Sequence, residues 1–218
     1  MKQTIRKFMK RKGPLAENEV KDLLKAYKIP TTNYMLVNKE ADLARFNLQF
    51  PVALKICSAD ILHKTDVGGV KLNIRTKEEL VREFKKFEKK FPNNNFLIDQ
   101  MVPSGAEIIV GLVQDSTFGL TIMCGIGGIF TELYQDVSFR IIPIDEYDAR
   151  QMIEELKGKK LLEGFRHLKA NKELVVDLLL KVSSIGQELI NHIDQMDLNP
   201  VFVYDKNLCV VDAKLILK

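Results

Sequence analysis

Apolar residues along the chain alternate between the spacing of amphipathic helices and the short runs typical of buried strands. Residues 17–28 place apolar side chains on one helical face, and this pattern stops before Pro30. The same spacing predicts further helices over 39–49, 76–91, 146–156 and 172–193. Strands are expected over 34–37, 52–57, 69–74, 96–102, 107–113, 120–124 and 137–142, followed by a closing hairpin of 196–204 and 208–217. This mixture predicts an α+β or α/β architecture.

Length and composition narrow the class of protein. A chain of 218 residues can bury one good core, or two small lobes that share a cleft. Its 33 basic and 29 acidic residues give a formal net charge of +4, a mixed balance that argues against a nucleic-acid partner. A mild positive excess is compatible with a polyanionic ligand such as a nucleotide, and with many other functions.

The sequence gives little evidence of targeting segments or of reactive or paired cysteines. The first 13 residues are rich in lysine and arginine, which is typical of a cationic N-terminal arm. No apolar run reaches the roughly 18 residues of a membrane span, so we expect no membrane partner and a cytoplasmic location. Cys57, Cys124 and Cys209 lie far apart in apolar segments and are interpreted as buried, reduced thiols.

The loop between the strands expected over 52–57 and 69–74 carries the most informative chemistry. It holds His63 among lysines and glycines. Backbone N–H groups next to glycine can surround phosphate oxygens, and neutral histidine is a nitrogen nucleophile that can carry a covalent group. The simpler interpretation is a solvated or hydrogen-bonded histidine.

The closing hairpin offers a second group of polar residues. Asn199 and Asp212 are oxygen donors in otherwise apolar strands. With an even turn, Asp212 is expected opposite Val201, with Asn199 two positions along on the same face, close enough for both to reach one Mg²⁺. Alternatively, Asn199 only begins a strand and Asp212 pairs with Lys214.

Several segments together resemble one family. Residues 63–70 read HKTDVGGV and follow an apolar strand that contains a lysine, which resembles the nucleotide loop of the ATP-grasp domain of nucleoside-diphosphate-forming acyl-CoA synthetases. The strings DLNP at 197–200 and VVDA at 210–213 resemble the magnesium-binding end of that domain. Residues 100–111, 118–119, 125–133 and 136–140 also match, so the likeness covers nearly the whole chain after the first dozen residues.

The resemblance implies an ATP-grasp fold for residues 1–218, with lobes near 17–102 and 103–218 and nucleotide bound between them. It implies roles for residues of both lobes. Lys55 would neutralise nucleotide phosphates, Asn199 and Asp212 would hold Mg²⁺, and His63 would carry a phosphoryl group. Glu107 and the backbone at Gln100 and Val102 would contact the nucleotide, although family members often have an acidic or proline residue in place of Gln100. Arg140 would contact phosphate or phosphohistidine, unless it forms only a surface ion pair.

The activity that the resemblance implies is acetyl-CoA + ADP + phosphate giving acetate + ATP + CoA. A CoA-binding alpha subunit would be the partner, in a heterotetramer. Three alternatives stay open: an ATP-grasp ligase that uses no phosphohistidine, the nucleotide lobe of a protein acetyltransferase fusion, and a nucleotide-sensing subunit without catalysis. His167 and His192 lie in helical surroundings and are poorer candidates for a carrier than His63.

Overall fold

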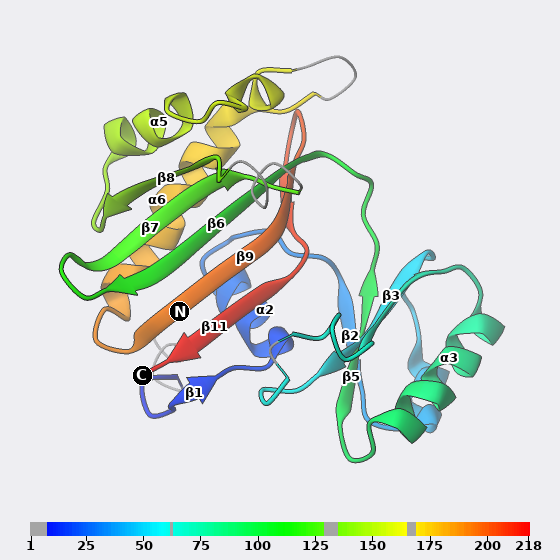
Figure 1. Cartoon of the computed structure of the whole chain (residues 1–218). Coiled ribbons are helices and arrows are strands. Elements are labelled where there is room, and N and C mark those ends of the chain that lie inside the picture. The colour runs from blue at the N-terminus through cyan, green and yellow to red at the C-terminus, as the bar shows by residue number, and fades with distance from the viewer. Residues whose placement is uncertain (1–7, 62, 129–134, 165–168) are drawn as a thin grey trace. The chain divides into compact units, whose positions relative to one another are not determined.

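The computed structural model describes residues 8–61, 63–128, 135–164 and 169–218 (Figure 1). By their contacts the residues form two compact units. The small unit comprises Pro14–Glu19 and Thr32–Pro103. The large unit comprises Val20–Thr31 and Ser104–Lys218, with the N-terminal residues up to Gly13. Within the described residues, no helix is both long and apolar enough to cross a membrane.

A four-stranded sheet with one helix forms the framework of the small unit, as far as the chain is described. Its strand order is β2 (Tyr34–Val37), β5 (Asn95–Gln100), β3 (Val52–Cys57) and β4 (Val70–Ile74), and neighbouring strands are antiparallel. Helix α3 (Lys77–Lys90) packs against β3 and β4. Its N-cap is Thr76, whose side chain accepts the Glu79 N–H at 3.1 Å.

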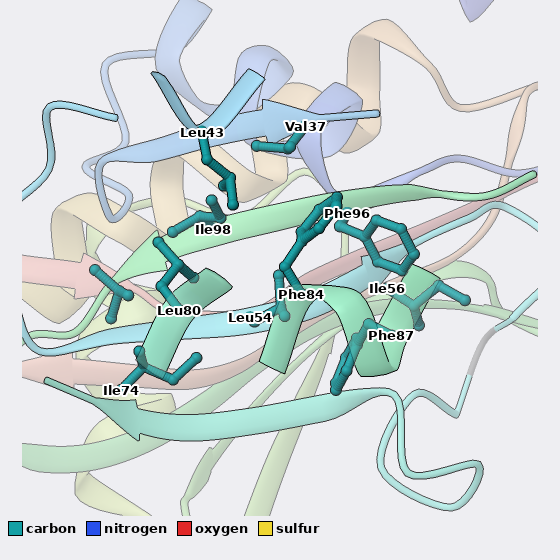
Figure 2. Close-up of a cluster of buried hydrophobic side chains, with 11 residues drawn as sticks. Val37, Leu43, Leu54, Ile56, Ile74, Leu80, Phe84, Phe87, Phe96 and Ile98 are labelled. Carbon is teal, nitrogen blue, oxygen red and sulfur yellow. The ribbon is translucent and has the colours of Figure 1, made fainter. Parts of the chain in front are cut away.

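The core of the small unit lies between this sheet and α3 (Figure 2). Alternate residues of β3, at 52, 54 and 56, join the cluster that contains Phe84 and Phe96. The rings of Phe84 and Phe96 pack edge to face, with centroids 5.2 Å apart. All six residues of β3 are nevertheless buried, including those at 53, 55 and 57 that point to the opposite face. Lys55 therefore extends from a strand that is covered on both sides.

A large sheet dominates the second unit, and its strands from β6 to β11 pair antiparallel. Its order in the described chain is β1-β11-β9-β6-β7-β8, with β10 paired to β9. The bounds are β1 Gly13–Pro14, β6 Ala106–Asp115, β7 Gly119–Ile126, β8 Val137–Ile141, β9 Ile193–Val203, β10 Leu208–Val210 and β11 Ala213–Leu217. Helices α5 (Glu146–Glu154) and α6 (Lys172–Glu188) pack on one face of this sheet, where α6 contacts β6, β7 and β9 (Figure 1). Helix α2 (Glu17–Ala26) begins in the small unit and ends in the large one.

Most expected elements are present, and the largest differences from the expected bounds are at three of them. The helix expected over 39–49 is only a 3-10 helix, Glu40–Arg45, in which Leu43 alone is buried, so that packing gives a longer helix little support. Helix α6 ends at Glu188, since Ile193 already pairs in β9. The last strand is divided into β10 and β11, with Val211 and Asp212 between them. A second 3-10 helix, Lys159–Leu162, was not expected.

Candidate functional site

His63 lies at the surface of the small unit, in the connection from β3 to β4. Its side chain is 75% exposed, and Nδ1 lies 3.9 Å from Oδ2 of Asp66, which is longer than a hydrogen bond. An exposed imidazole can reach a group that approaches from solvent. The structure thus gives His63 the accessibility that a nucleophile needs.

The residues that follow His63 form a closed turn. The Gly69 N–H donates to the Lys64 carbonyl at 2.7 Å, and the Gly68 N–H donates to the Thr65 carbonyl at 2.9 Å. Gly68 has a φ of +63°, which glycine adopts without strain. A Cβ on Gly69 would lie 2.6 Å from Ile56 Cγ2, so the turn rests directly on β3. Both glycines are therefore required by the shape of the loop.

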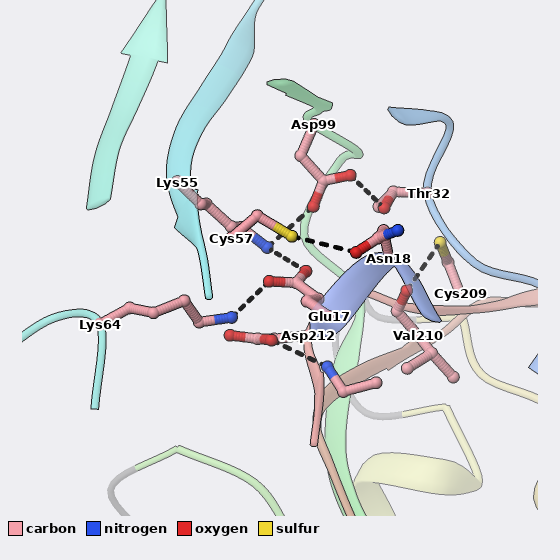
Figure 3. Close-up of polar contacts among 11 residues, drawn as sticks. Glu17, Asn18, Thr32, Lys55, Cys57, Lys64, Asp99, Cys209, Val210 and Asp212 are labelled. Carbon is pink, nitrogen blue, oxygen red and sulfur yellow. Dashed lines mark hydrogen bonds and ion pairs between the residues drawn. The ribbon is translucent and has the colours of Figure 1, made fainter. Parts of the chain in front are cut away.

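Lys55 lies on the face of β3 that does not meet α3, inside a cluster of buried charges (Figure 3). Its Nζ donates to Glu17 Oε1 at 2.9 Å and to Asp99 Oδ2 at 2.8 Å. Lys64 Nζ pairs with the other oxygen of Glu17, and the Thr32 hydroxyl donates to Asp99. The two lysines and two carboxylates balance in charge. Such pairing is needed because a buried charge without a partner costs a large desolvation energy.

Glu107 belongs to β6 of the large unit and packs against the turn that follows β7. The Gly127 N–H donates to the Glu107 carbonyl at 2.7 Å, and a Cβ on Gly127 would lie only 2.5 Å from Glu107 Cγ. The turn at 125–128 thus contributes glycines for close approach to Glu107. The matching segment continues into 129–133, which lies outside the described residues.

Asn199 and Asp212 lie opposite each other, and the expected register is corrected by two residues. Val210 pairs with Val201 and Ala213 pairs with Leu198, so Asp212 faces Asn199 rather than Val201. The Asn199 N–H donates to the Asp212 carbonyl at 3.1 Å. The connection from Val203 to Leu208 is a four-residue loop, which is even as the expectation required but two residues longer than the loop that would place Asp212 opposite Val201, and this accounts for the shift.

A further carboxylate lies near this pair on β9. Asp197 precedes Asn199 by two positions on β9 and lies opposite Lys214. Burial raises the pKa of the Asp197 carboxyl, the charge of Lys214 lowers it, and the nearby charge of Asp212 raises it further. Strand alternation applied to the DLNP string would have identified Asp197 as a third oxygen donor.

The residues present fit Mg²⁺. This ion prefers oxygen ligands and needs only one or two from protein when phosphate and water supply the rest. Asn199 and Asp212 offer such oxygens opposite each other, and Asp197 offers another, close enough for the charge of Asp212 to affect its pKa. In the described part of the chain, no three His, Cys, Asp or Glu side chains form a complete protein metal cage.

Arg140 forms an ion pair on β8. Its guanidinium meets Glu155 through two bonds, Nη1 to Oε2 at 3.0 Å and Nη2 to Oε1 at 2.5 Å, and it lies 4.0 Å from Asp148. Hydrogen bonding to Glu155 raises the pKa of Arg140. The structure therefore contains the ion pair that was the alternative to a phosphate contact for Arg140. Contact with a phosphoryl group stays a prediction and requires this pair to open.

The structure places Gln100, Val102 and His192 but does not test the roles predicted for them. Gln100 ends β5, and its N–H donates to the Asn33 carbonyl at 2.8 Å. Val102 lies in the irregular segment after β5. Their nucleotide contacts stay predictions. His167 lies outside the described residues, and His192 lies between the end of α6 and β9 rather than at the helix end.

Sequence reasoning missed three members of the buried charge cluster: Glu17, Lys64 and Asp99. Asp99 was detectable, because β5 pairs with β3 and places Asp99 diagonally from Lys55. The sequence indicates Lys64 only as a neighbour of His63, and Glu17 only as the start of a helix, because no periodic pattern links either residue to Lys55.

Comparison with known proteins identifies the family of this chain and several relatives. The ATP-grasp domain family matches residues 8–217, so the likeness begins at residue 8, within the dozen residues that were expected to fall outside it, and residues 1–7 lie outside the match. The beta subunit of an ADP-forming acetate–CoA ligase (I) from Pyrococcus furiosus is 38% identical over 99% of this chain and 97% of its own length.

Two solved structures of acetyl-coenzyme A synthetase 1 from Ca. Korarchaeum cryptofilum are also similar. One, described with a phosphorylated phosphohistidine segment in a site I orientation, is 40% identical with a TM-score of 0.84 and covers 95% of this chain and 94% of its own. The other, with Mg-AMPPCP and that segment pointing towards the nucleotide-binding site, is 42% identical with a TM-score of 0.81 and covers 94% and 93%. The fold, the matched residues and these relatives agree, and the chain belongs to the ATP-grasp domain family, among the beta subunits of ADP-forming acetate–CoA ligases.

Proposed function

We propose that this chain is the nucleotide-binding subunit of an ADP-forming acetate–CoA ligase in which His63 carries a phosphoryl group. The observation that carries the proposal is an exposed His63 on a glycine-dependent turn, beside a buried lysine cluster in the same unit. The overall reaction is acetyl-CoA + ADP + phosphate giving acetate + ATP + CoA.

Two transfers at His63 account for the role of this chain. In the first, a neutral imidazole nitrogen of His63 attacks a phosphoryl group that the partner subunit has received from an acyl phosphate. A nitrogen–phosphorus bond forms on His63 as the bond from phosphorus to the donor atom of the partner breaks, and the donor group keeps that electron pair. In the second, a terminal phosphate oxygen of ADP attacks the phosphorus, and the nitrogen–phosphorus bond breaks to regenerate imidazole and form ATP. Positioning and charge neutralisation are the main demands of such transfers.

Residues of both units have separate tasks in the second transfer. Lys55 neutralises nucleotide phosphates, which requires Glu17 or Asp99 to give up part of its contact with the lysine. Glu107 and the backbone at Gln100 and Val102 orient the nucleotide. Asn199 and Asp212 hold Mg²⁺, which, when bound, draws charge from the phosphate oxygens. Arg140 contacts the phosphoryl group after release from Glu155.

The relatives support a division of labour between subunits. The Pyrococcus relative is named a beta subunit, and the Korarchaeum protein is described with its phosphohistidine segment in two orientations. We propose that this chain likewise works with a CoA-binding alpha subunit in a cytoplasmic heterotetramer. We also propose that residues 1–218 act as one ATP-grasp domain with lobes near 17–102 and 103–218.

Trapping the phosphorylated chain tests the proposal. The chain and its partner are incubated with acetyl-CoA and labelled phosphate without ADP, and acid-labile phosphate is located by mass spectrometry. We expect label on His63 that leaves as ATP when ADP is added. The variant His63→Ala should bind ADP and give no turnover, whereas His192→Ala serves as the matched control and should retain both.

Two results would contradict the carrier role. Label that stays on the partner while ADP still yields ATP would mean that phosphate passes directly to the nucleotide. Loss of ADP binding in a folded His63→Ala chain would instead make His63 a ligand contact.

A further inference from the structure

Glu17 connects the two lysines of the small unit through one carboxylate. Oε1 accepts from Lys55 and Oε2 pairs with Lys64 (Figure 3). The carboxylate side chain is only 3% exposed and the Lys64 side chain 8% exposed. Breaking a buried pair leaves an uncompensated charge, so this contact is far more persistent than a surface ion pair.

Lys64 is also the first residue of the turn that follows His63. Its carbonyl accepts the Gly69 N–H at 2.7 Å, and the Gly69 carbonyl in turn accepts the Ile56 N–H of β3 at 2.8 Å. Both the side chain and the backbone of Lys64 are therefore held. Its neighbours His63 and Asp66 have side chains that are 75% and 79% exposed.

The position of His63 follows from this anchor. Consecutive Cα atoms are about 3.8 Å apart, so His63 cannot move far while Lys64 stays paired. We infer that Glu17 is a positioning residue, which acts through Lys64 to place the imidazole of His63 for phosphoryl transfer. This inference rests on the proposed carrier role of His63, and it adds that a long excursion of His63 requires the Lys64–Glu17 pair or the turn to open.

Phosphorylation of His63 by ATP measures the transfer between His63 and the nucleotide on its own. The chain is mixed with magnesium and γ-labelled ATP; the His63 nitrogen bonds to the γ-phosphorus, the bond to the bridging oxygen breaks, and ADP leaves. We expect Lys64→Met to slow the labelling of His63 by about 100-fold, the cost of a displacement near 1 Å, with ADP affinity unchanged. Glu17→Gln should slow it as well. Lys64→Arg, which can keep a charged contact with Glu17, should recover much of the rate.

Matched controls separate positioning from general damage. Lys71→Met replaces an exposed lysine on β4, and Glu88→Gln replaces an exposed glutamate on α3. In both variants, His63 should be labelled at the wild-type rate. Circular dichroism and thermal unfolding verify that each variant is folded before its rate is compared.

The outcomes distinguish this inference from the carrier proposal. A wild-type chain that never acquires label on His63, with or without its partner, would reject the carrier role itself. Normal labelling of wild type together with normal labelling of Lys64→Met would overturn only the positioning role of Glu17. If neither Lys64→Met nor Glu17→Gln folds, the pair serves stability alone and the inference is likewise overturned.

Discussion

Replacing Lys55 with methionine should destabilise the small unit by about 3 kcal/mol. Removing one partner of a buried ion pair typically costs about 3–5 kcal/mol, because the remaining charge is left in a poorly solvated place. The Lys55 side chain is 6% exposed, and those of its partners Glu17 and Asp99 are 3% exposed. Methionine keeps most of the apolar stem, so little packing is lost.

The lower end of that range is expected because neither carboxylate becomes isolated. Glu17 retains Lys64, and Asp99 retains the hydroxyl of Thr32. The charge balance among these four side chains nevertheless changes from zero to one excess negative charge. Raising the salt concentration should recover little of the loss, since buried pairs are screened weakly.

Urea unfolding followed by circular dichroism measures this loss. Lys71→Met is the matched control: the same substitution on the neighbouring strand β4, at an exposed position, should change stability by no more than about 0.5 kcal/mol. If Lys55→Met were as stable as Lys71→Met, the buried cluster would contribute nothing, and the argument from desolvation would be refuted.

Three further changes probe other parts of the chain. Phe84→Ala should cost about 3–5 kcal/mol in urea unfolding, because Phe84 is fully buried against Phe96; a cost below about 1 kcal/mol would contradict the packing. Gly127→Ala should weaken ADP binding about 10- to 100-fold by calorimetry, since the new Cβ would displace Glu107; unchanged affinity would exclude Glu107 as a contact. Burial, aided by the charge of Asp136, raises the pKa of Cys124 to about 12. The native thiol should therefore resist iodoacetamide at pH 8 and react only after unfolding; rapid native alkylation would contradict this.

Local patterns were sufficient for most elements and for the residues with a characteristic string. Alternation and helical spacing identified the strands around Val52–Cys57 and the helix after Thr76, because half-buried elements repeat their apolar residues with a fixed period. The same patterns overestimated the extent of the helix expected over 39–49. They also gave the wrong partner for Asp212, because the register of a hairpin depends on the length of its loop.

The sequence by itself determined the α+β class, the buried strand that carries Lys55, the glycine-bearing loop of His63 and the family likeness, since each depends on neighbouring residues. Only the tertiary structure decided that Glu17 joins Lys55 to Lys64, that Asp99 shares Lys55, and that Arg140 is paired with Glu155. Glu17 is 38 residues from Lys55 and 47 from Lys64 along the chain. Burial pairs such charges because an ion without a partner is costly away from water, and no local periodicity specifies which distant carboxylate will supply it.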